Sequence, residues 1–475
     1  MTAQFHVVFF PLMAQGHLIP TLEIVKLFSS RGLKTTIVTT KLHVPVITKS
    51  IEKTNHSGNQ INISIIKFPC KEVGLPEGSE SLDTLKQPDM FMKFFRGLSL
   101  LQEPFEQILQ ELSPDCLVAD MFFPWTTNVA AKYNIPRFVF HGFCLFALCV
   151  SENIRSYKPF KDVESDSEPI VLPNFPNQIE FSKAQVPGSD LGIKDGATEL
   201  FKQINEADIT SYGIIINSFN ELEKDYVDYY RNVCGRRAWL LGPLSLINRN
   251  KDKTLIDEHE CLKWLDSKKP YSVIYACFGS VGRLSKLQLH EIALGLESSG
   301  HYFIWVVKKS EEAEKWLPEG FEERIKDKGL IIRGWAPQVS ILEQESTGGF
   351  VTHCGWNSTL EAISAGVPMA TLPTFAEQPF NEKLLTRVLK IGIPVGSPLS
   401  NRAVSLVKRE EVSDAVKRVM EGEEAIEMRT RAKSLKKMAC KAVEEGGSSY
   451  NDLTSLIDGV KAYRSQSSEA EEEHN

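Results

Sequence analysis

The 475-residue sequence lacks the short signatures of several large protein classes. None of its nine cysteines forms a C-x-x-C pair and several lie within apolar runs, so we expect reduced thiols and neither a zinc site nor a disulfide framework. The turn after the first apolar run, PLMAQGH, has one glycine where a dinucleotide-binding turn needs G-x-G-x-x-G. A Walker-type loop is absent, and no aspartate is followed two residues later by another. These absences argue against a dehydrogenase, a P-loop enzyme and a nucleotide clamped through a metal by paired carboxylates.

Positive charge and long apolar segments are also scarce. The 54 Lys and Arg against 61 Asp and Glu give a net charge of −7, which argues against nucleic-acid binding through a basic surface. The longest later apolar stretch, Phe138 to Val150, is too short to cross a bilayer. No basic residue precedes Lys26, so a secretory signal is not indicated and we expect a cytoplasmic protein. The acidic segment 465–475 predicts a frayed tail.

Length and patterning predict two domains. Hydrophobic residues make up 42% and charged residues 24% of the chain, an ordinary globular composition, and 475 residues exceed what one core usually supports. Short continuous apolar runs alternate with amphipathic stretches, which is typical of parallel strands covered by helices on both faces. We predict an α/β protein of two Rossmann-like, doubly wound domains facing a cleft, over residues 1–243 and 258–450. Segment 244–257 is the predicted linker, and helices near 408–445 are expected to pack back across the cleft.

A dense group of polar residues follows the apolar run GGFVTHCG in the second half. His353, Asn357 and Ser358 lie where a strand turns into a helix, and the free amides and positive dipole end of a helix N-terminus attract anions. The residues therefore predict a phosphate site. A helix cap and a strand-end histidine are the simpler structural explanation for each residue taken singly.

Three neighbouring features extend this site toward a nucleotide sugar. Trp335 follows a strand and could stack on a base, although it could also close the core. Glu361 falls one turn after Asn357 and could reach ribose hydroxyls. Glu377 and Gln378 pair a carboxylate with an amide, which suits vicinal hydroxyls of a sugar, while an exposed helix start explains such a pair equally well.

The first half offers a candidate base and its partner. His17 lies at the start of the first predicted helix, where the helix dipole disfavours protonation and helps keep the imidazole neutral. Asp120 ends the apolar strand CLVAD, where a charge is costly unless it has a partner. A carboxylate on the imidazole Nδ1 would fix the tautomer, as in other base–orienter pairs. Two unrelated strand-end residues remain the alternative.

The 44 residues from Trp335 to Gln378 resemble the plant secondary product glycosyltransferase box in length and in nearly every fixed position. The whole chain resembles a plant family 1 UDP-dependent glycosyltransferase of the GT-B fold, including the segments FPLMAQGHLIPTLEIVKL, VADMFFPW and VIYACFGS. The resemblance implies an inverting, metal-independent displacement that uses UDP-glucose as co-substrate and needs no other cofactor.

The resemblance also implies roles for individual residues. His17 matches the general base and Asp120 the carboxylate that balances its charge. Trp335 matches the residue that stacks on uracil, and Glu361 matches the ribose ligand. The remaining matches are Ala336 and Gln338 for reading the base, Ser280, His353, Asn357 and Ser358 for the diphosphate, and Trp356, Glu377 and Gln378 for the sugar.

Three positions depart from many relatives. Phe143 stands where a small hydroxyl residue is frequent, Pro379 where an aromatic follows the Glu-Gln pair, and Leu372 where tryptophan is frequent. We expect a monomer that glucosylates a small hydrophobic plant metabolite, a flavonoid or other phenolic. A triterpenoid or steroidal acceptor, C-glycosylation and an inactive nucleotide-sugar-binding protein are the alternatives.

Overall fold

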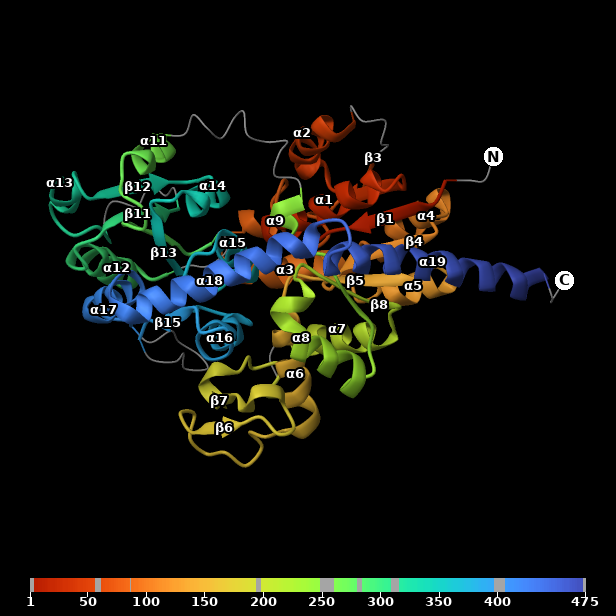
Figure 1. Cartoon of the computed structure of the whole chain (residues 1–475). Coiled ribbons are helices and arrows are strands. Elements are labelled where there is room, and N and C mark those ends of the chain that lie inside the picture. Colours follow the sequence, from red (N-terminus) through yellow and green to blue (C-terminus); the bar gives the residue numbers. More distant parts are fainter. Residues whose placement is uncertain are drawn as a thin grey trace.

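Two parallel β-sheets, each covered by helices, make up the chain (Figure 1). The computed structural model describes residues 4–55, 61–85, 87–193, 198–247, 260–279, 284–308, 316–396 and 406–472. Predicted Ser280 and residues 248–257 of the predicted linker lie outside these ranges.

The first sheet has seven strands in the order β3-β2-β1-β4-β5-β8-β9, and every pairing is parallel. Strands β1, β4, β5, β8 and β9 of this sheet are buried at every position because helices cover both faces. The strands are β1 (His6–Phe10), β2 (Lys34–Thr39), β3 (Ile61–Ile65), β4 (Cys116–Asp120), β5 (Arg137–His141), β8 (Gly213–Ile216) and β9 (Ala238–Leu240).

The helices around this sheet are α1 (Gln15–Ser30), α2 (Val44–Asn55), α3 (Pro88–Ser99), α4 (Gln102–Leu112), α5 (Thr126–Lys132), α6 (Leu145–Tyr157), α7 (Thr198–Thr210), α8 (Asn220–Asp228) and α9 (Leu244–Ile247). A small antiparallel hairpin of β6 (Pro169–Val171) and β7 (Glu180–Ser182) lies in the long segment after α6. It forms the lower edge of the molecule in Figure 1.

The second sheet has six strands in the order β12-β11-β10-β13-β14-β15, again all parallel. The strands are β10 (Val273–Cys277), β11 (Tyr302–Val307), β12 (Gly329–Arg333), β13 (Thr347–Thr352), β14 (Met369–Thr371) and β15 (Gly392–Pro394). The helices are α11 (Glu260–Asp266), α12 (Lys286–Ser298), α13 (Phe321–Ile325), α14 (Gln338–Glu343), α15 (Trp356–Ala365) and α16 (Gln378–Lys383). Two Rossmann-like parallel sheets confirm the predicted fold class.

Three C-terminal helices connect the second sheet back to the first. We expected the helices near 408–445 to return across the cleft, but α17 (Arg409–Met420) packs on α12 of the second sheet. The next helix, α18 (Gly422–Val443), touches both α15 and α8, and α19 (Ser448–Glu472) lies along β9 of the first sheet (Figure 1). The predicted return across the junction is thus made by α18 and α19, and residues 465–472 of the predicted tail continue α19.

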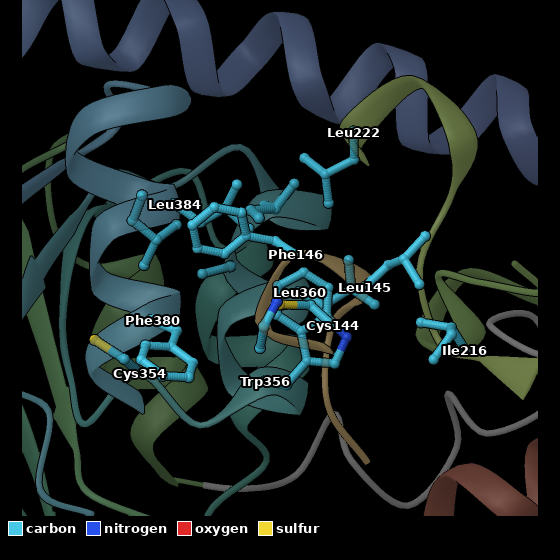
Figure 2. Close-up of a cluster of buried hydrophobic side chains, with 14 of the residues drawn as sticks. Cys144, Leu145, Phe146, Ile216, Leu222, Cys354, Trp356, Leu360, Phe380 and Leu384 are labelled. Carbon is cyan, nitrogen blue, oxygen red and sulfur yellow. The ribbon is translucent and has the colours of Figure 1, made fainter. Parts of the chain in front are cut away.

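The two sheets share one hydrophobic cluster at their junction. It joins residues of α6 and β8 to residues of α15 and α16, and Figure 2 shows Trp356 beside Cys144 and Leu145, which begin α6. A shared apolar core of this kind holds two domains in a defined relation, because separating them would expose its surface to water. Within the described ranges, none of the helices has both the length and the apolar character that crossing a bilayer requires.

The docking of α19 makes a testable contribution to stability. Leu456 is 1% exposed in the same core as Val7 and Leu22, so Leu456→Ala should lower the free energy of unfolding by about 2–5 kcal/mol. The exposed neighbour Ser455 is the matched control, and Ser455→Ala should change it by less than about 0.5 kcal/mol. Urea unfolding followed by tryptophan fluorescence measures both. Equal effects of the two changes would show that α19 is not part of this core.

Candidate active site

His17 and Asp120 meet at the edge of the first sheet that faces the second. The imidazole Nδ1 lies 2.7 Å from Asp120 Oδ2, and the side chains are 18% and 0% exposed. The other carboxylate oxygen, Oδ1, accepts the backbone N–H of Phe122 at 3.1 Å. The pairing fixes the ring and leaves Nε2 as the nitrogen able to take a proton.

The N-terminus of α1, which carries His17, is capped from a distant loop. Its own N-cap residue, Ala14, offers no side-chain cap, and Asp83 Oδ2 accepts the N–H of Gln15 at 2.7 Å instead. Asp83 lies in a short 3-10 turn, Leu82–Thr84, within the long connection between β3 and α3. Asp83 therefore holds this loop against the helix that positions the imidazole.

The surroundings of His17 favour its protonated form. Burial is the largest influence and lowers the pKa of the imidazole, but the charge and hydrogen bond of Asp120 outweigh it, together with the charges of Glu377 and Asp83. The net pKa is raised above the ordinary value of 6.5. We expected a neutral imidazole because of the helix dipole. The three carboxylates have the opposite effect and raise the pKa of His17.

Across the junction, the N-terminus of α15 faces the N-terminus of α1. Asn357 Nδ2 donates to the carbonyl oxygen of Gly16 at 2.7 Å, so one predicted phosphate ligand bridges the two domains. The first intrahelical bond runs from Thr359 N–H to Gly355 O, so the preceding amides have no helical acceptor. Free amides at a helix N-terminus are suited to an anion.

His353 is enclosed next to this helix end. A Cβ built on Gly279 or Gly355 would lie 2.6 or 2.4 Å from its Nε2, so only glycine lets both loops approach the ring. Its Nδ1 is buried without a hydrogen-bond partner. Burial lowers the pKa of His353 to about 4, helped by Lys308 and opposed by the backbone of Cys277. The ring is neutral at pH 7 and can offer one N–H to an anion.

The predicted base- and ribose-binding residues form one hydrogen-bonded network. Gln338 Nε2 donates to Glu361 Oε2 at 2.7 Å and to Ser358 Oγ at 2.9 Å, and its Oε1 accepts the hydroxyl of Tyr275 at 3.2 Å. Burial raises the pKa of Glu361 to about 7 against the opposing hydrogen bond of Gln338. The network holds the carboxyl group in place before any ligand arrives.

Trp335 and Ala336 lie just before this network. The Trp335 side chain is 72% exposed, whereas Ala336 is partly buried against the shared core. An indole with that exposure at a strand end presents a broad apolar face, the geometry a stacked base requires.

The two adjacent residues predicted to face the sugar, Glu377 and Gln378, differ in how the protein engages their side chains. Glu377 is the N-cap residue of α16, and burial raises its pKa to about 7 against its own backbone, the charge of His17 and the side chain of Asn381. Gln378 Oε1 accepts three bonds from Thr374 and Phe375, so it organises the preceding turn. Its amide nitrogen is the part of the side chain left for a ligand.

Trp356 does not present its side chain to a cleft. The indole is 2% exposed in the shared core (Figure 2), and its N–H donates to the carbonyl of Asn217 at 2.7 Å, across the domain junction. Only the backbone of Trp356, at the first position of α15, lies near the residues predicted to bind the sugar and the diphosphate. The aromatic ring acts as a domain contact.

A pocket lined mainly by the first domain includes Met121, the residue after Asp120, and encloses about 670 Å³ of space, part of which is open solvent. Phe143, the first of the three unusual residues, lines it together with Leu148 and Phe201, and Glu377 closes it from the second domain. Leu372 is instead buried in the second domain's core, and Pro379 lies inside the first turn of α16. The pocket adjoins the base, although His17 itself is not among its lining residues.

The environment of His17 predicts a measurable titration. In histidine-selective NMR, its pKa should lie above the ordinary 6.5, because Asp120 stabilises the imidazolium. In Asp120→Asn the pKa should fall, because burial is then opposed only by the more distant carboxylates. His353, with a pKa lowered to about 4, is the internal control and should not move. An unchanged His17 pKa in the variant would refute this account of the pair.

Comparison with known proteins agrees with this geometry. Residues 3–246 match the family model described as "Glycosyltransferase, N-terminal domain", and residues 247–436 match "UDP-glucoronosyl and UDP-glucosyl transferase". The chain is 56% identical to scopoletin glucosyltransferase of Nicotiana tabacum, over 97% of this chain and 99% of the relative. It is 51% identical to anthocyanin 3'-O-beta-glucosyltransferase of Gentiana triflora, with the same coverage of 97% and 99%.

A solved structure also matches along its full length. The crystal structure of Glycyrrhiza uralensis UGT73P12 complexed with glycyrrhetinic acid 3-O-monoglucuronide superposes with a TM-score of 0.91 at 38% identity, covering 99% of each chain. Two family models and full-length relatives above half identity agree with the two-sheet fold. The chain belongs to the plant family 1 UDP-dependent glycosyltransferases and has their GT-B fold.

Proposed function

We propose that this glycosyltransferase transfers glucose from UDP-glucose to a hydroxyl of a phenolic plant metabolite, with inversion and without a metal. The observation that carries the proposal is the His17–Asp120 pair at 2.7 Å, beside a largely apolar pocket and opposite the N-terminus of α15. A base, an acceptor pocket and an anion-binding helix end are the three parts that such a displacement needs.

His17 serves as the general base in this proposal. Its Nε2 takes the proton from the acceptor hydroxyl as that oxygen forms a bond to the anomeric carbon of glucose. The bond between that carbon and the diphosphate oxygen breaks at the same time, and UDP departs with the electron pair. Asp120 keeps Nδ1 protonated and stabilises the imidazolium that forms.

The donor is held by the second domain. Trp335 stacks on uracil, Gln338 reads its edge together with the backbone of Ala336, and Glu361 binds the ribose hydroxyls. His353, Asn357, Ser358 and Ser280 take the diphosphate, and the dipole of α15 meets its growing charge without a cation. Glu377 and Gln378 grip the glucose hydroxyls, and the backbone of Trp356 lies beside them.

The acceptor class follows from the relatives and the pocket. Two full-length relatives are named for scopoletin and anthocyanin glucosylation, and both of those acceptors are phenols. Phe143 and Phe201 offer aromatic walls to a flat ring system. A triterpenoid acceptor is the second candidate, because a structural neighbour with a TM-score of 0.91 was crystallised with glycyrrhetinic acid 3-O-monoglucuronide.

Replacement of the base provides the test. His17→Ala should lower kcat for glucosylation of a phenol by at least about 100-fold, the usual contribution of a general base, because the variant loses the imidazole that takes the proton. Its affinity for UDP in calorimetry should stay within about twofold, since the donor residues lie on the other domain.

The two reference proteins are wild type and Gln338→Ala. The Gln338→Ala variant should weaken UDP binding, which His17→Ala should not do. Retained turnover in His17→Ala would exclude the assigned base. Tight UDP binding by wild type without glucosylation of any phenol or triterpenoid would favour a nucleotide-sugar-binding protein.

A further inference from the structure

A second histidine–carboxylate pair lies in the wall of the acceptor pocket. His141 ends β5, next to Gly142, and Asp208 projects from α7. The imidazole Nε2 and Asp208 Oδ2 are 2.9 Å apart, and the side chains are 1% and 8% exposed. Both residues line the pocket. The pair is therefore as buried as His17–Asp120 and borders the same acceptor space.

Unlike the first pair, this one leaves its polar atoms unsatisfied. Both ring nitrogens of His141 and the Oδ1 atom of Asp208 are buried without a hydrogen-bond partner, because the close contact between the two side chains lacks the angle of a hydrogen bond. Buried polar atoms without partners are costly, and a polar group of a ligand in the pocket would satisfy these ones. The pocket wall thus holds a carboxylate oxygen and an imidazole whose hydrogen-bonding capacity is not used.

Several other charged groups around the pocket are paired with one another. Arg155 binds Asp190 at 2.8 Å and Glu152 at 3.2 Å, and Arg236 binds Glu152 at 3.1 Å. Those groups satisfy one another and have less to offer to a ligand. Among the lining carboxylates, Asp190 is bonded through both oxygens, Glu377 accepts from Asn381 at 3.5 Å, and Asp208 Oδ1 is buried without a hydrogen-bond partner.

Two other groups near Asp208, Arg137 and Tyr230, do not form a hydrogen bond with its free oxygen. Arg137 is buried between the two aspartates, but its terminal nitrogens donate to Thr127 and to the carbonyls of Asp120 and Phe123. Burial raises the pKa of the Tyr230 phenol, and the charge of Asp208 raises it further, so the phenol is neutral. The free Asp208 oxygen is consequently left to a group that enters the pocket.

We propose that His141 and Asp208 form a subsite for a second hydroxyl of the acceptor, distinct from the one that His17 deprotonates. That hydroxyl donates to Asp208 Oδ1 and accepts an N–H from His141, while the apolar wall around Phe143 and Leu148 holds the ring. The subsite selects flat aromatic acceptors with two or more hydroxyls over those with one. This inference rests on the proposed glucosylation of phenols.

The experiment compares three flavones that share the reacting group. The probes are 7-hydroxyflavone, 5,7-dihydroxyflavone and 7,4′-dihydroxyflavone, and only the 7-O-glucoside is counted, by chromatography against a standard. Wild type should have a kcat/KM about 10- to 100-fold higher for a dihydroxyflavone than for 7-hydroxyflavone, the worth of a hydrogen bond to a charged group. Asp208→Asn should reduce this ratio by at least about tenfold.

Controls separate this role from a structural one. Asp452→Asn alters another largely buried carboxylate, which accepts the N–H of Leu240 and does not line the pocket, and should leave the ratio unchanged. If Asp208→Asn lowers Tm and slows all three flavones equally, the pair merely ties α7 to β5 and the inference is wrong.

The wild-type ratio keeps the inference testable even if the variant fails to fold. Equal use of all three flavones by wild type overturns the hydroxyl subsite but leaves the proposed function standing. Absence of any glucoside from wild type, with flavones and other phenols alike, refutes the proposed function itself.

Discussion

The meeting of two helix N-termini across the domain junction is the constraint on which the site depends. The parallel sheets bring the starts of α1 and α15 face to face, and the Asn357 side chain bridges to the carbonyl of Gly16. Two positive dipole ends at close range repel unless negative groups lie between them. Asp83 and Asp120 provide that charge on the α1 side. On the α15 side we propose that the diphosphate of the donor provides it.

This arrangement explains the unusual protonation of the site. Three carboxylates act on His17 and raise its pKa, whereas Glu377 and Glu361 are so buried that their own pKa values rise to about 7. The carboxyl groups nearest the ligands therefore carry their charge only in part at neutral pH. Less charge has to be desolvated when a nucleotide sugar binds, because each of these groups already has a protein partner or a neutral form available.

Much of the fold was predictable because its strands are continuous apolar runs. The runs that contain β1, β4, β5, β10 and β13 are buried on both faces, and such runs reveal parallel sheets directly. The juxtaposition of His17 and Asp120 was predictable in part, since both lie at the carboxyl edge of one sheet. The path of α19 was not, because its polar end resembles a disordered tail and its contacts with β9 come from a distant part of the chain.

The candidate site, like the fold, was predictable from the sequence only in part. The box from Trp335 to Gln378 predicts the donor residues through their order along the chain, but it does not reveal which way a side chain turns. Trp356 faces the domain junction because Asn217 accepts its N–H, a contact across 139 residues of sequence. Asp83 and the His141–Asp208 pair escaped prediction for the same reason: each acts on a group that only the tertiary fold brings near.

The dependence of kcat on pH, at saturating UDP-glucose and phenol, tests the central claim most directly. A base with a raised pKa must lose its proton before it acts, so the rate of wild type should fall as pH drops through a pKa above 6.5. In Asp120→Asn this acid limb should move to lower pH, and the plateau rate should fall because the imidazolium is less stabilised. A profile that is flat through this range, or an acid limb at the same pH in both proteins, would contradict the role of the His17–Asp120 pair.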